Sequence, residues 1–524
     1  MKLRTIVKIA ITSSVVLLCS GFALYSFFRL SAAEGQKDFN LYELVPSTTL
    51  AVFVTDDVLE FVAEVDELTC SKNQQYLYVS KLFSYLKQSL YALSEDTPHG
   101  LSRQMNQMLI SFHEPDNERN QVLYCRLGNG DKELVNRFVR KYISSLYPPK
   151  TFIYKGEEII IYPMADGDFL ACYLTSDFMA LSFQKKLIEN VIDAYKSGKS
   201  LADDSTFTGI RAPKKSAAAA TIYTRMQGMM GWTEFDMKMK DDFIYFSGIT
   251  HDADTCFAFI NQLRQQQSVK GFPGEVLPST AFYFSRQGIT DWVSLLSYGN
   301  AQGQSVPART SEVQNRDKEF SRYLMENAGQ DLVACLFQRE DTLQGAAAVL
   351  SLSVADVTEA ERMLRALVNA ASADEGRRNP RITFCYTVNK AYPIYRLPQT
   401  TLFEQLTSFA EPTLDVYAAF YGGRLLLAPD ADAFAHYIRQ LDKGEVLNGA
   451  MAYQTGMDHL SDSYHFMLMA DFDHIFQQSE NHVRFVPDFF LRNADFFRHF
   501  TLFVQFACAD GMVYPTIVLK YKSE

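Results

Sequence analysis

DFLACYLTSDFMALS (residues 168–182) and LDVYAAFYGGRLLLA (residues 414–428) share one pattern of strand, turn and strand. They lie 246 residues apart (414 − 168), and each runs into a helical pattern that ends at a glycine. The two predicted helices are residues 185–197 before Gly198 and residues 430–442 before Gly444. A glycine after the last helical residue is typical of a left-handed C-cap. Matching strands, turns and caps at one offset predict an internal duplication of the chain.

A second match marks where each copy begins. Val45-Pro46-Ser47-Thr48 recurs as Leu277-Pro278-Ser279-Thr280, and an apolar strand pattern follows each. Gln262–Val276 contains three consecutive glutamines and a Gly-Phe-Pro-Gly turn, so we interpret it as a helix end and a connector. The predicted units are a first α+β repeat over residues 45–261, a connector over 262–276, and a second repeat over 277–524 with an insertion over 477–499.

The closing hairpins of the two copies indicate the fold class. Residues 235–240 turn at Asp241-Asp242 into residues 243–249, and residues 501–506 turn at Asp510-Gly511 into residues 512–520. Acidic and glycine residues between apolar strands are typical of a β-hairpin. Adjacent hairpins with helices between them predict an α+β fold, in which helices cover one face of a mainly antiparallel sheet.

The N-terminus carries a separate signal. Lys2, Arg4 and Lys8 precede an uncharged apolar run of 20 residues, 9–28. At about 1.5 Å per residue, such a helix is about 30 Å long, which matches the hydrocarbon core of a membrane. We expect a cytoplasmic tail over residues 1–8, a transmembrane signal anchor over 9–28 and a juxtamembrane segment over 29–44. A cleaved signal peptide is the alternative, because Ser31-Ala32-Ala33 offers small residues for cleavage.

These features together predict the fold class and the location. We expect an α+β protein with a single N-terminal transmembrane helix, followed by a duplicated domain of mainly antiparallel sheet packed with helices. Basic residues before the apolar run place the N-terminus in the cytoplasm. The expected location is therefore the cytoplasmic (inner) membrane, as a single-pass protein with its body on the periplasmic side.

Composition limits the class of protein. The 524 residues include 50 Lys and Arg against 61 Asp and Glu, a net charge of −11. Four of the basic residues lie in or beside residues 9–28, so the exported part carries 46 − 61 = −15. Because phosphate binding needs a basic surface, we expect no nucleic-acid partner. Seven of the eight cysteines are exported without a Cys-x-x-Cys pair, so we expect buried free thiols, with one or two disulfides as the alternative.

The overall pattern resembles a known family. A single N-terminal anchor, a duplicated body, Pro-Ser-Thr strand starts and the run from the capped helix through Gly198 and Leu201 to Phe207 look like the domain of unknown function 3352 family. The resemblance covers most of the exported part and rests on a structural pattern rather than on a catalytic signature. It implies a bacterial cell-envelope protein without an assigned reaction or known catalytic residues.

Two stretches resemble phosphate-binding loops but lack essential positions. Gly198-Lys199-Ser200 follows a helix, whereas a phosphate cradle precedes one, and Asp193 stands where the loop needs its first glycine. Gly128-Asn129-Gly130 has Glu133 at the third glycine position, where a carboxylate would oppose a pyrophosphate. We therefore expect no nucleotide partner and no cofactor.

Histidines cluster late in the chain, at His436, His459, His465, His474, His482 and His499. Asp458, Asp471 and Asp473 lie near them in sequence, so an envelope hydrolase or a metal-dependent enzyme is one alternative. However, no pair has the spacing of a recognised metal motif, and no Gly-x-Ser-x-Gly elbow is present. We therefore expect no metal site and no catalytic residue, with these histidines at the surface and at strand edges.

Aromatic and methionine residues supply the remaining candidates. The insertion repeats phenylalanine at three- and four-residue steps, typical of an amphipathic helix that faces the core, a partner or lipid. A methionine-rich stretch packs in the core or forms an adaptable surface. The candidate partner-binding residues are Phe485, Phe489, Phe490, Phe496, Phe497, Met229, Met230 and Trp232. We predict a non-enzymatic scaffold or partner-binding protein of the cell envelope, with an apolar-ligand or lipid carrier as another alternative.

Overall fold

A computed structural model describes the fold of this chain. The described residues are 39–73, 105–114, 119–128, 131–138, 147–164, 167–211, 218–225, 231–250, 258–293, 295, 310–339, 345–374, 382–387, 390–398, 400–407, 415–478 and 486–522.

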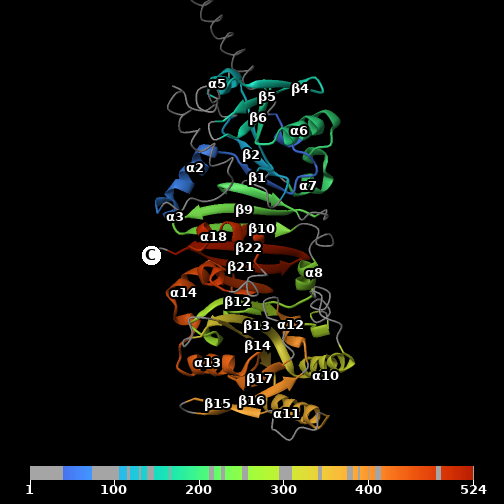
Figure 1. The fold of residues 1–524 in the computed structure, drawn as a ribbon, viewed down its shortest axis with the longest axis vertical. Helices are drawn as coiled ribbons and strands as arrows, with labels where there is room; N and C mark the ends of the chain where they lie inside the picture. The colour runs from blue at the N-terminus through green and yellow to red at the C-terminus, as the bar shows by residue number, and fades with distance from the viewer. Residues whose placement is uncertain are drawn as a thin grey trace, which may run out of the picture.

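One antiparallel sheet of 20 strands runs through the described residues (Figure 1). The strands of the first half run, from the outer edge to the centre, in the order β4 (Lys150–Tyr154), β5 (Glu157–Pro163), β6 (Phe169–Leu174), β7 (Phe178–Ser182), β3 (Gln121–Arg126), β2 (Met108–Phe112), β1 (Ala51–Thr55), β8 (Ala220–Thr224), β9 (Thr233–Lys240) and β10 (Phe243–Thr250). Those of the second half run in the order β15 (Ile382–Tyr386), β16 (Ala391–Pro398), β17 (Asp415–Tyr421), β18 (Arg424–Ala428), β14 (Ala346–Val354), β13 (Ala328–Gln338), β12 (Ala281–Gly288), β20 (Phe466–Asp471), β21 (Phe500–Ala509) and β22 (Met512–Tyr521).

The strand order is therefore the same when it is followed inward from either outer edge. The two series meet where β10 pairs antiparallel with β22, with Ser247 opposite Thr516. Ser247 lies six residues after Asp241 and Thr516 six residues after Asp510, the two hairpin-turn residues with positive φ. Equivalent residues thus face each other at the centre, so a pseudo-two-fold axis passes between Ser247 and Thr516.

The predicted fold class is wrong in its architecture. The two halves do not form separate sheets, because β10 and β22 would each leave an edge of unpaired backbone groups, and their ladder satisfies both. Among the described residues, no helix is long and apolar enough to cross a membrane. The transmembrane helix expected over residues 9–28 lies outside the described residues. The boundaries predicted for the two repeats stay a prediction.

Helices cover both faces of the sheet rather than one, which corrects a second expectation. In the first half, α6 (Lys185–Ser197) and α7 (Ser205–Ile210) pack on one face, and α2 (Val58–Glu67) and α3 (Thr69–Lys72) on the other. In the second half, α13 (Ala431–Asp442) and α14 (Met451–Met457) pack on one face, and α10 (Ser311–Asn327), α11 (Val357–Asp374) and α12 (Leu402–Leu406) on the other. The pseudo-two-fold relation places α6 on the right and α13 on the left in Figure 1.

Shorter elements complete the described residues. The remaining α-helices are α5 (Asp131–Phe138), α8 (Ala258–Arg264), α15 (Phe472–Phe476), α17 (Asp488–Arg492) and α18 (Ala494–Phe497). The 3-10 helices are η1 (Leu41–Glu43), η3 (Leu201–Asp203), η5 (Pro273–Val276) and η6 (Leu447–Gly449), and β11 (Val269–Lys270) pairs with β19 (Ser463–Tyr464) in a separate small sheet.

Local sequence signals explain why these elements form where they do. Apolar residues of α6 recur at helical spacing, from Leu187 to Ile192, and are buried against the sheet. Gly198 ends that helix with a φ of 64°, which confirms the predicted left-handed cap. The hairpins at Asp241 and Asp510 are also confirmed.

The cysteines agree with the expectation of free thiols. Six of them lie in the described residues and all six are free, and all but Cys508 are buried. Burial raises the pKa of the Cys125 and Cys172 thiols to about 12, so both thiols stay protonated at neutral pH. Cys19 and Cys256 lie outside the described residues.

Candidate ligand-binding pocket

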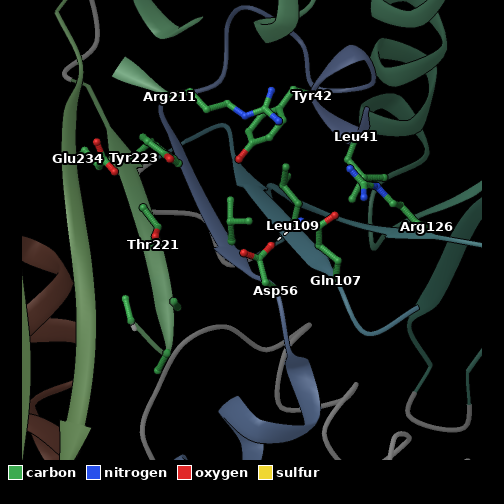
Figure 2. Close-up of a pocket in the computed structure, with 14 residues that line it drawn as sticks. Leu41, Tyr42, Asp56, Gln107, Leu109, Arg126, Arg211, Thr221, Tyr223 and Glu234 are labelled. Atoms are coloured by element: carbon green, nitrogen blue, oxygen red, sulfur yellow. Dashed lines mark hydrogen bonds between the residues drawn. The ribbon is translucent and has the colours of Figure 1, made fainter. Parts of the chain in front are cut away.

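A cavity of about 450 Å³ lies on the α6 side of the sheet in the first half, and we call it the first-half pocket (Figure 2). Side chains of β1, β2, β3, β8 and β9 line it, together with η1 and the residue that follows α7. Its size falls within the range of small-molecule sites, about 300–1,000 Å³.

Charged groups of both signs line the first-half pocket. Asp56 follows β1 and Glu234 belongs to β9, whereas Arg126 ends β3 and Arg211 caps α7. Side chains alternate between the two faces of a strand, so Asp56 lies on the same face as Val54, which also lines the cavity. Gln107, the residue before β2, donates a hydrogen bond from Nε2 to Asp56 Oδ1 (Figure 2).

The charged side chains of the pocket affect the Tyr42 hydroxyl. Burial raises the pKa of Tyr42 to about 12; Arg211 opposes this shift, Asp56 and Glu234 add to it, and Arg126 opposes it. The Arg211 guanidinium lies 4.0 Å from the centre of the Tyr42 ring, a cation–π contact. The four charged side chains come from separate segments of the chain, and each of them affects the pKa of Tyr42.

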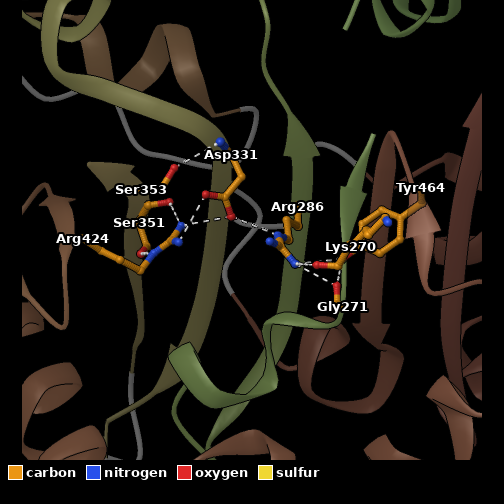
Figure 3. Close-up of polar contacts among 8 residues, drawn as sticks. All are labelled: Lys270, Gly271, Arg286, Asp331, Ser351, Ser353, Arg424 and Tyr464. Carbon is orange, nitrogen blue, oxygen red and sulfur yellow. Dashed lines mark hydrogen bonds and ion pairs between the residues drawn. The ribbon is translucent and has the colours of Figure 1, made fainter. Parts of the chain in front are cut away.

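The equivalent place in the second half is occupied by an ion-pair network (Figure 3). Asp331 accepts a hydrogen bond from Arg286 Nε at 3.0 Å and from Arg424 Nη1 and Nη2 at 3.2 and 3.3 Å. Arg286 also donates to the Gly271 carbonyl oxygen at 2.8 Å and to the Tyr464 hydroxyl at 3.3 Å. Backbone and side-chain acceptors therefore hold the Arg286 guanidinium in place.

The strand registers show which residues of the first half are equivalent to those of the ion-pair network. Val54 pairs with Leu109 and Thr221, and Arg286 pairs with Val333 and Met467 in the same way. By the same registers, Gln107 is equivalent to Asp331, Ala218 to Tyr464, and Glu234 to Phe503. Small side chains in the first half thus stand where arginine and tyrosine fill the second half, and this difference leaves the cavity.

The second half has a cavity of its own, about 270 Å³, which we call the second-half pocket. Asp471, His474 and Lys522 line it, with Asp471 Oδ1 at 2.7 Å from Lys522 Nζ and Asp471 Oδ2 at 3.4 Å from His474 Nδ1. The first-half residue equivalent to Asp471 is Arg225. Its guanidinium pairs with Asp204 at 3.6 Å and lies 4.7 Å from the Trp232 ring centre, so in the first half a paired arginine occupies the position that Asp471 has in the second-half pocket.

Replacing Asp471 with asparagine is expected to lower the pKa of His474. The Asp471 carboxylate raises that pKa above its ordinary value of 6.5, against the opposing effect of burial. Since the folded-state pKa is the higher one, the pair stabilises the fold below about pH 6.5, and this stabilisation is lost as the pH rises through the folded-state pKa.

The measurement is an NMR titration of ¹³C-labelled histidines in both proteins. His459 is the internal control, because burial lowers its pKa and Asp471 does not contribute to that shift. An unchanged His474 titration in the variant would show that the carboxylate does not control it.

The late histidines do not converge on one site. The His459 ring contacts Phe243, with centroids 4.3 Å apart, and His465 Nδ1 accepts a hydrogen bond from the Cys508 N–H at 3.1 Å. His436 lies on α13, His499 lies against Tyr521, and His482 is outside the described residues. In the described part of the chain, no group of three or more His, Cys, Asp or Glu side chains is arranged to hold a metal ion.

The candidate partner-binding residues do not share one surface. Phe485, Met229 and Met230 lie outside the described residues. Trp232 is 1% exposed and packs against Phe207. Within the insertion, Phe497 is buried, Phe490 and Phe496 are half-buried, and Phe489 is exposed. Phe490 contacts the apolar cores of both halves, so this segment packs across their junction.

Sequence reasoning missed the residues of the first-half pocket. Asp56, Arg126, Arg211 and Glu234 belong to no recognised sequence motif. The usable signal was a difference between the copies. When the two Pro-Ser-Thr strands are aligned, Val54 is equivalent to Arg286. A small apolar residue in one copy thus corresponds to a long cationic residue in the other.

The chain was compared with family models, curated proteins and solved structures, and none of them matches it. The resemblance to the domain of unknown function 3352 family therefore stays a prediction.

Proposed function

We propose that this chain is a non-enzymatic binding protein and that it holds a small polar molecule in the first-half pocket. The observation that carries the proposal is the difference between equivalent places: Val54 and Ala218 leave a cavity where Arg286 and Tyr464 close the second half. In the second copy of the same fold, larger side chains thus occupy these positions, so the small side chains of the first half are not a requirement of the fold.

The lining supplies groups that suit the binding of a polar molecule. Among the described residues that line the first-half pocket there is no histidine, cysteine or serine. The Tyr42 hydroxyl, with a pKa of about 12, stays protonated near neutral pH and is a poor general base. The remaining side chains are suited to hydrogen bonding and charge pairing.

The same lining favours a polar ligand over an apolar one. Four charged side chains face the cavity, and covering them with an apolar molecule would remove their water without replacing its hydrogen bonds. The carrier alternative would place the phenylalanines of the insertion in a pocket, but Phe490 packs against the cores of both halves, and Phe496 and Phe497 pack in the core of the first half. A location in the cell envelope is part of this proposal and rests on residues 2–28 of the sequence. Cell fractionation tests the location, and recovery in the cytosolic fraction alone would contradict it.

Closing the first-half pocket is expected to abolish ligand binding without unfolding the protein. The double variant Val54→Arg and Gln107→Asp introduces the arginine–aspartate pair of the second half at equivalent positions. The measurement is thermal unfolding with a panel of amino acids, sugars and organic acids. A ligand at roughly a hundredfold excess over its Kd stabilises the wild type by about 2.7 kcal/mol, whereas the closed variant should gain nothing.

The matched control is Val293→Arg, because Val293 is an exposed valine outside the pocket. It should respond to ligand as the wild type does, and circular dichroism checks that the closed variant is folded. The proposal fails if no panel molecule stabilises the wild type, or if the closed variant is stabilised equally.

A further inference from the structure

We infer that the ligand of the first-half pocket is a small zwitterion with a cationic nitrogen group, of the kind that an arginine-like amino acid presents. Its guanidinium or ammonium group is placed with Asp56 and Glu234, and its carboxylate with Arg126 and Arg211. This inference rests on the proposed function and names the class of ligand.

The second half shows what chemistry suits this place. There the Arg286 guanidinium lies between the Asp331 carboxylate, a backbone carbonyl oxygen and the Tyr464 hydroxyl. In the first half the equivalent of that arginine is Val54, while a carboxylate, Asp56, lies two residues further along the same face of the chain. The first half therefore has Val54 in place of the arginine and Gln107 in place of Asp331, while Asp56 supplies a carboxylate beside Gln107. A cationic ligand group would find an anionic partner there.

Glu234 gives a second, independent reason. Its side chain is 1% exposed and lines the pocket, whereas the equivalent Phe503 is 0% exposed in an apolar core. Burying a carboxylate is costly unless charges and hydrogen bonds compensate for it, and the second half shows that an apolar side chain packs well at this position. Glu234 thus brings to the first-half pocket a carboxylate that the second half lacks at this position, and a carboxylate suits recognition of a cation.

Arg126 and Arg211 suit the carboxylate end of the ligand. Arginine binds carboxylates through a planar fork of donors, often with two parallel hydrogen bonds. Arg211 is held over the Tyr42 ring and donates to Asn40 Oδ1 at 3.5 Å, so the side chain has a defined orientation. The equivalent of Arg126 in the second half is Ser353, which forms a hydrogen bond with the Asp331 N–H.

The spacing of the charged side chains favours a ligand with separated charges. Arg126 lies on β3 and Glu234 on β9, and β2, β1 and β8 lie between them. Four spacings of about 4.8 Å place the two backbones roughly 19 Å apart, and long side chains reach inward from both. Figure 2 shows Arg126 and Glu234 on opposite sides of the cavity, with Asp56 between them. A ligand with a flexible chain between its charges fits this arrangement better than glycine does.

Isothermal titration calorimetry of the full chain tests this inference with L-arginine as the probe. L-citrulline has the same shape without the cation, and agmatine keeps the guanidinium without the carboxylate. Each is expected to bind at least about tenfold more weakly than L-arginine, a difference of about 1.4 kcal/mol. N-acetyl-L-arginine tests whether the natural ligand is a free amino acid or the C-terminus of a peptide. It has no free amino group, so it should bind if the ligand is a peptide C-terminus and should not bind if the pocket recognises the free amino group.

Variants separate recognition from packing. Glu234→Gln should weaken L-arginine at least about tenfold while changing L-citrulline little, a loss of discrimination that a packing defect would not produce. Glu157→Gln is the matched control, because Glu157 pairs with Lys196 outside the pocket, and it should leave both affinities unchanged. Equal binding of L-arginine and L-citrulline to the wild type would overturn the inference.

The two proposals fail in different ways. If a sugar or an organic acid stabilises the wild type but not the closed variant, and L-arginine does not bind, the ligand class is wrong and the binding function stands. If no panel molecule binds in the pocket, both are wrong.

Discussion

Replacing Asp331 with alanine is expected to lower the free energy of unfolding by about 3–5 kcal/mol, because it leaves two buried guanidinium groups without their shared carboxylate. The Arg286 and Arg424 side chains are largely buried and both point to this one residue (Figure 3). Arg424 also donates from Nε to Ser351 Oγ at 2.6 Å, so it has little freedom to move toward solvent. Urea denaturation of the variant and the wild type measures the difference.

The control for this prediction is Glu359→Gln. Glu359 pairs with Arg362 on the exposed surface of α11, where water and salt screen the charges, so stability should stay close to that of the wild type. Equal effects of the two substitutions would show that burial does not strengthen the Asp331 network.

The Asp331 network also predicts how the free energy of unfolding depends on pH. Burial alone would raise the pKa of Asp331, but Arg424, Ser353 and Arg286 outweigh it and hold that pKa below its ordinary value. Because the folded-state pKa is the lower one, the contribution is present above about pH 4 and is lost as the pH falls through the folded-state pKa. The Asp331→Ala variant should therefore lose less stability on acidification than the wild type.

Replacing Phe497 with alanine is expected to cost about 3–5 kcal/mol, the usual range for a large aromatic side chain removed from a core. Phe497 is 4% exposed and belongs to the apolar cluster of the first half, although it lies late in the second half. Its ring contacts Phe490 and Phe496, with centroids 4.8 and 5.0 Å apart. The substitution thus removes contacts that join the two halves, and denaturant unfolding measures the loss.

Phe489 provides the comparison within the same segment. It is 38% exposed, so Phe489→Ala should cost clearly less than Phe497→Ala. A partner-binding role for the insertion predicts the opposite pattern, in which both variants keep their stability and lose a partner. Similar unfolding curves for Phe497→Ala and the wild type would contradict the packing described here.

Local features of the fold could be predicted because they depend on neighbouring residues. The turns at Asp241 and Asp510 and the cap at Gly198 follow from backbone conformations that few residue types adopt. The pairing of β10 with β22 could not be predicted in this way. It joins strands separated by more than 250 residues, and an apolar strand pattern does not specify which edge it will meet.

The first-half pocket could not be predicted from the sequence for a related reason. Asp56, Arg126, Arg211 and Glu234 come from four segments that only the folded sheet brings together, and none of them belongs to a motif. Their meaning depends on Val54 and Ala218, whose small size leaves the cavity, and a small apolar residue on a strand is an ordinary observation. The Phe-rich insertion shows the reverse case, since its helical spacing is prominent but its burial makes it part of the core.

The central ladder has a consequence for how the chain selects its partner strand. β10 meets an equivalent strand of the same chain, and the second half of another molecule offers an identical hydrogen-bonding edge. Exchange of identical elements between protomers is known as domain swapping, and hydrogen-bond chemistry does not distinguish the swapped from the closed form. Covalent linkage does distinguish them, because it keeps the two edges at a high effective concentration. The peptide connection between the halves, rather than the ladder itself, therefore favours the closed single-chain form.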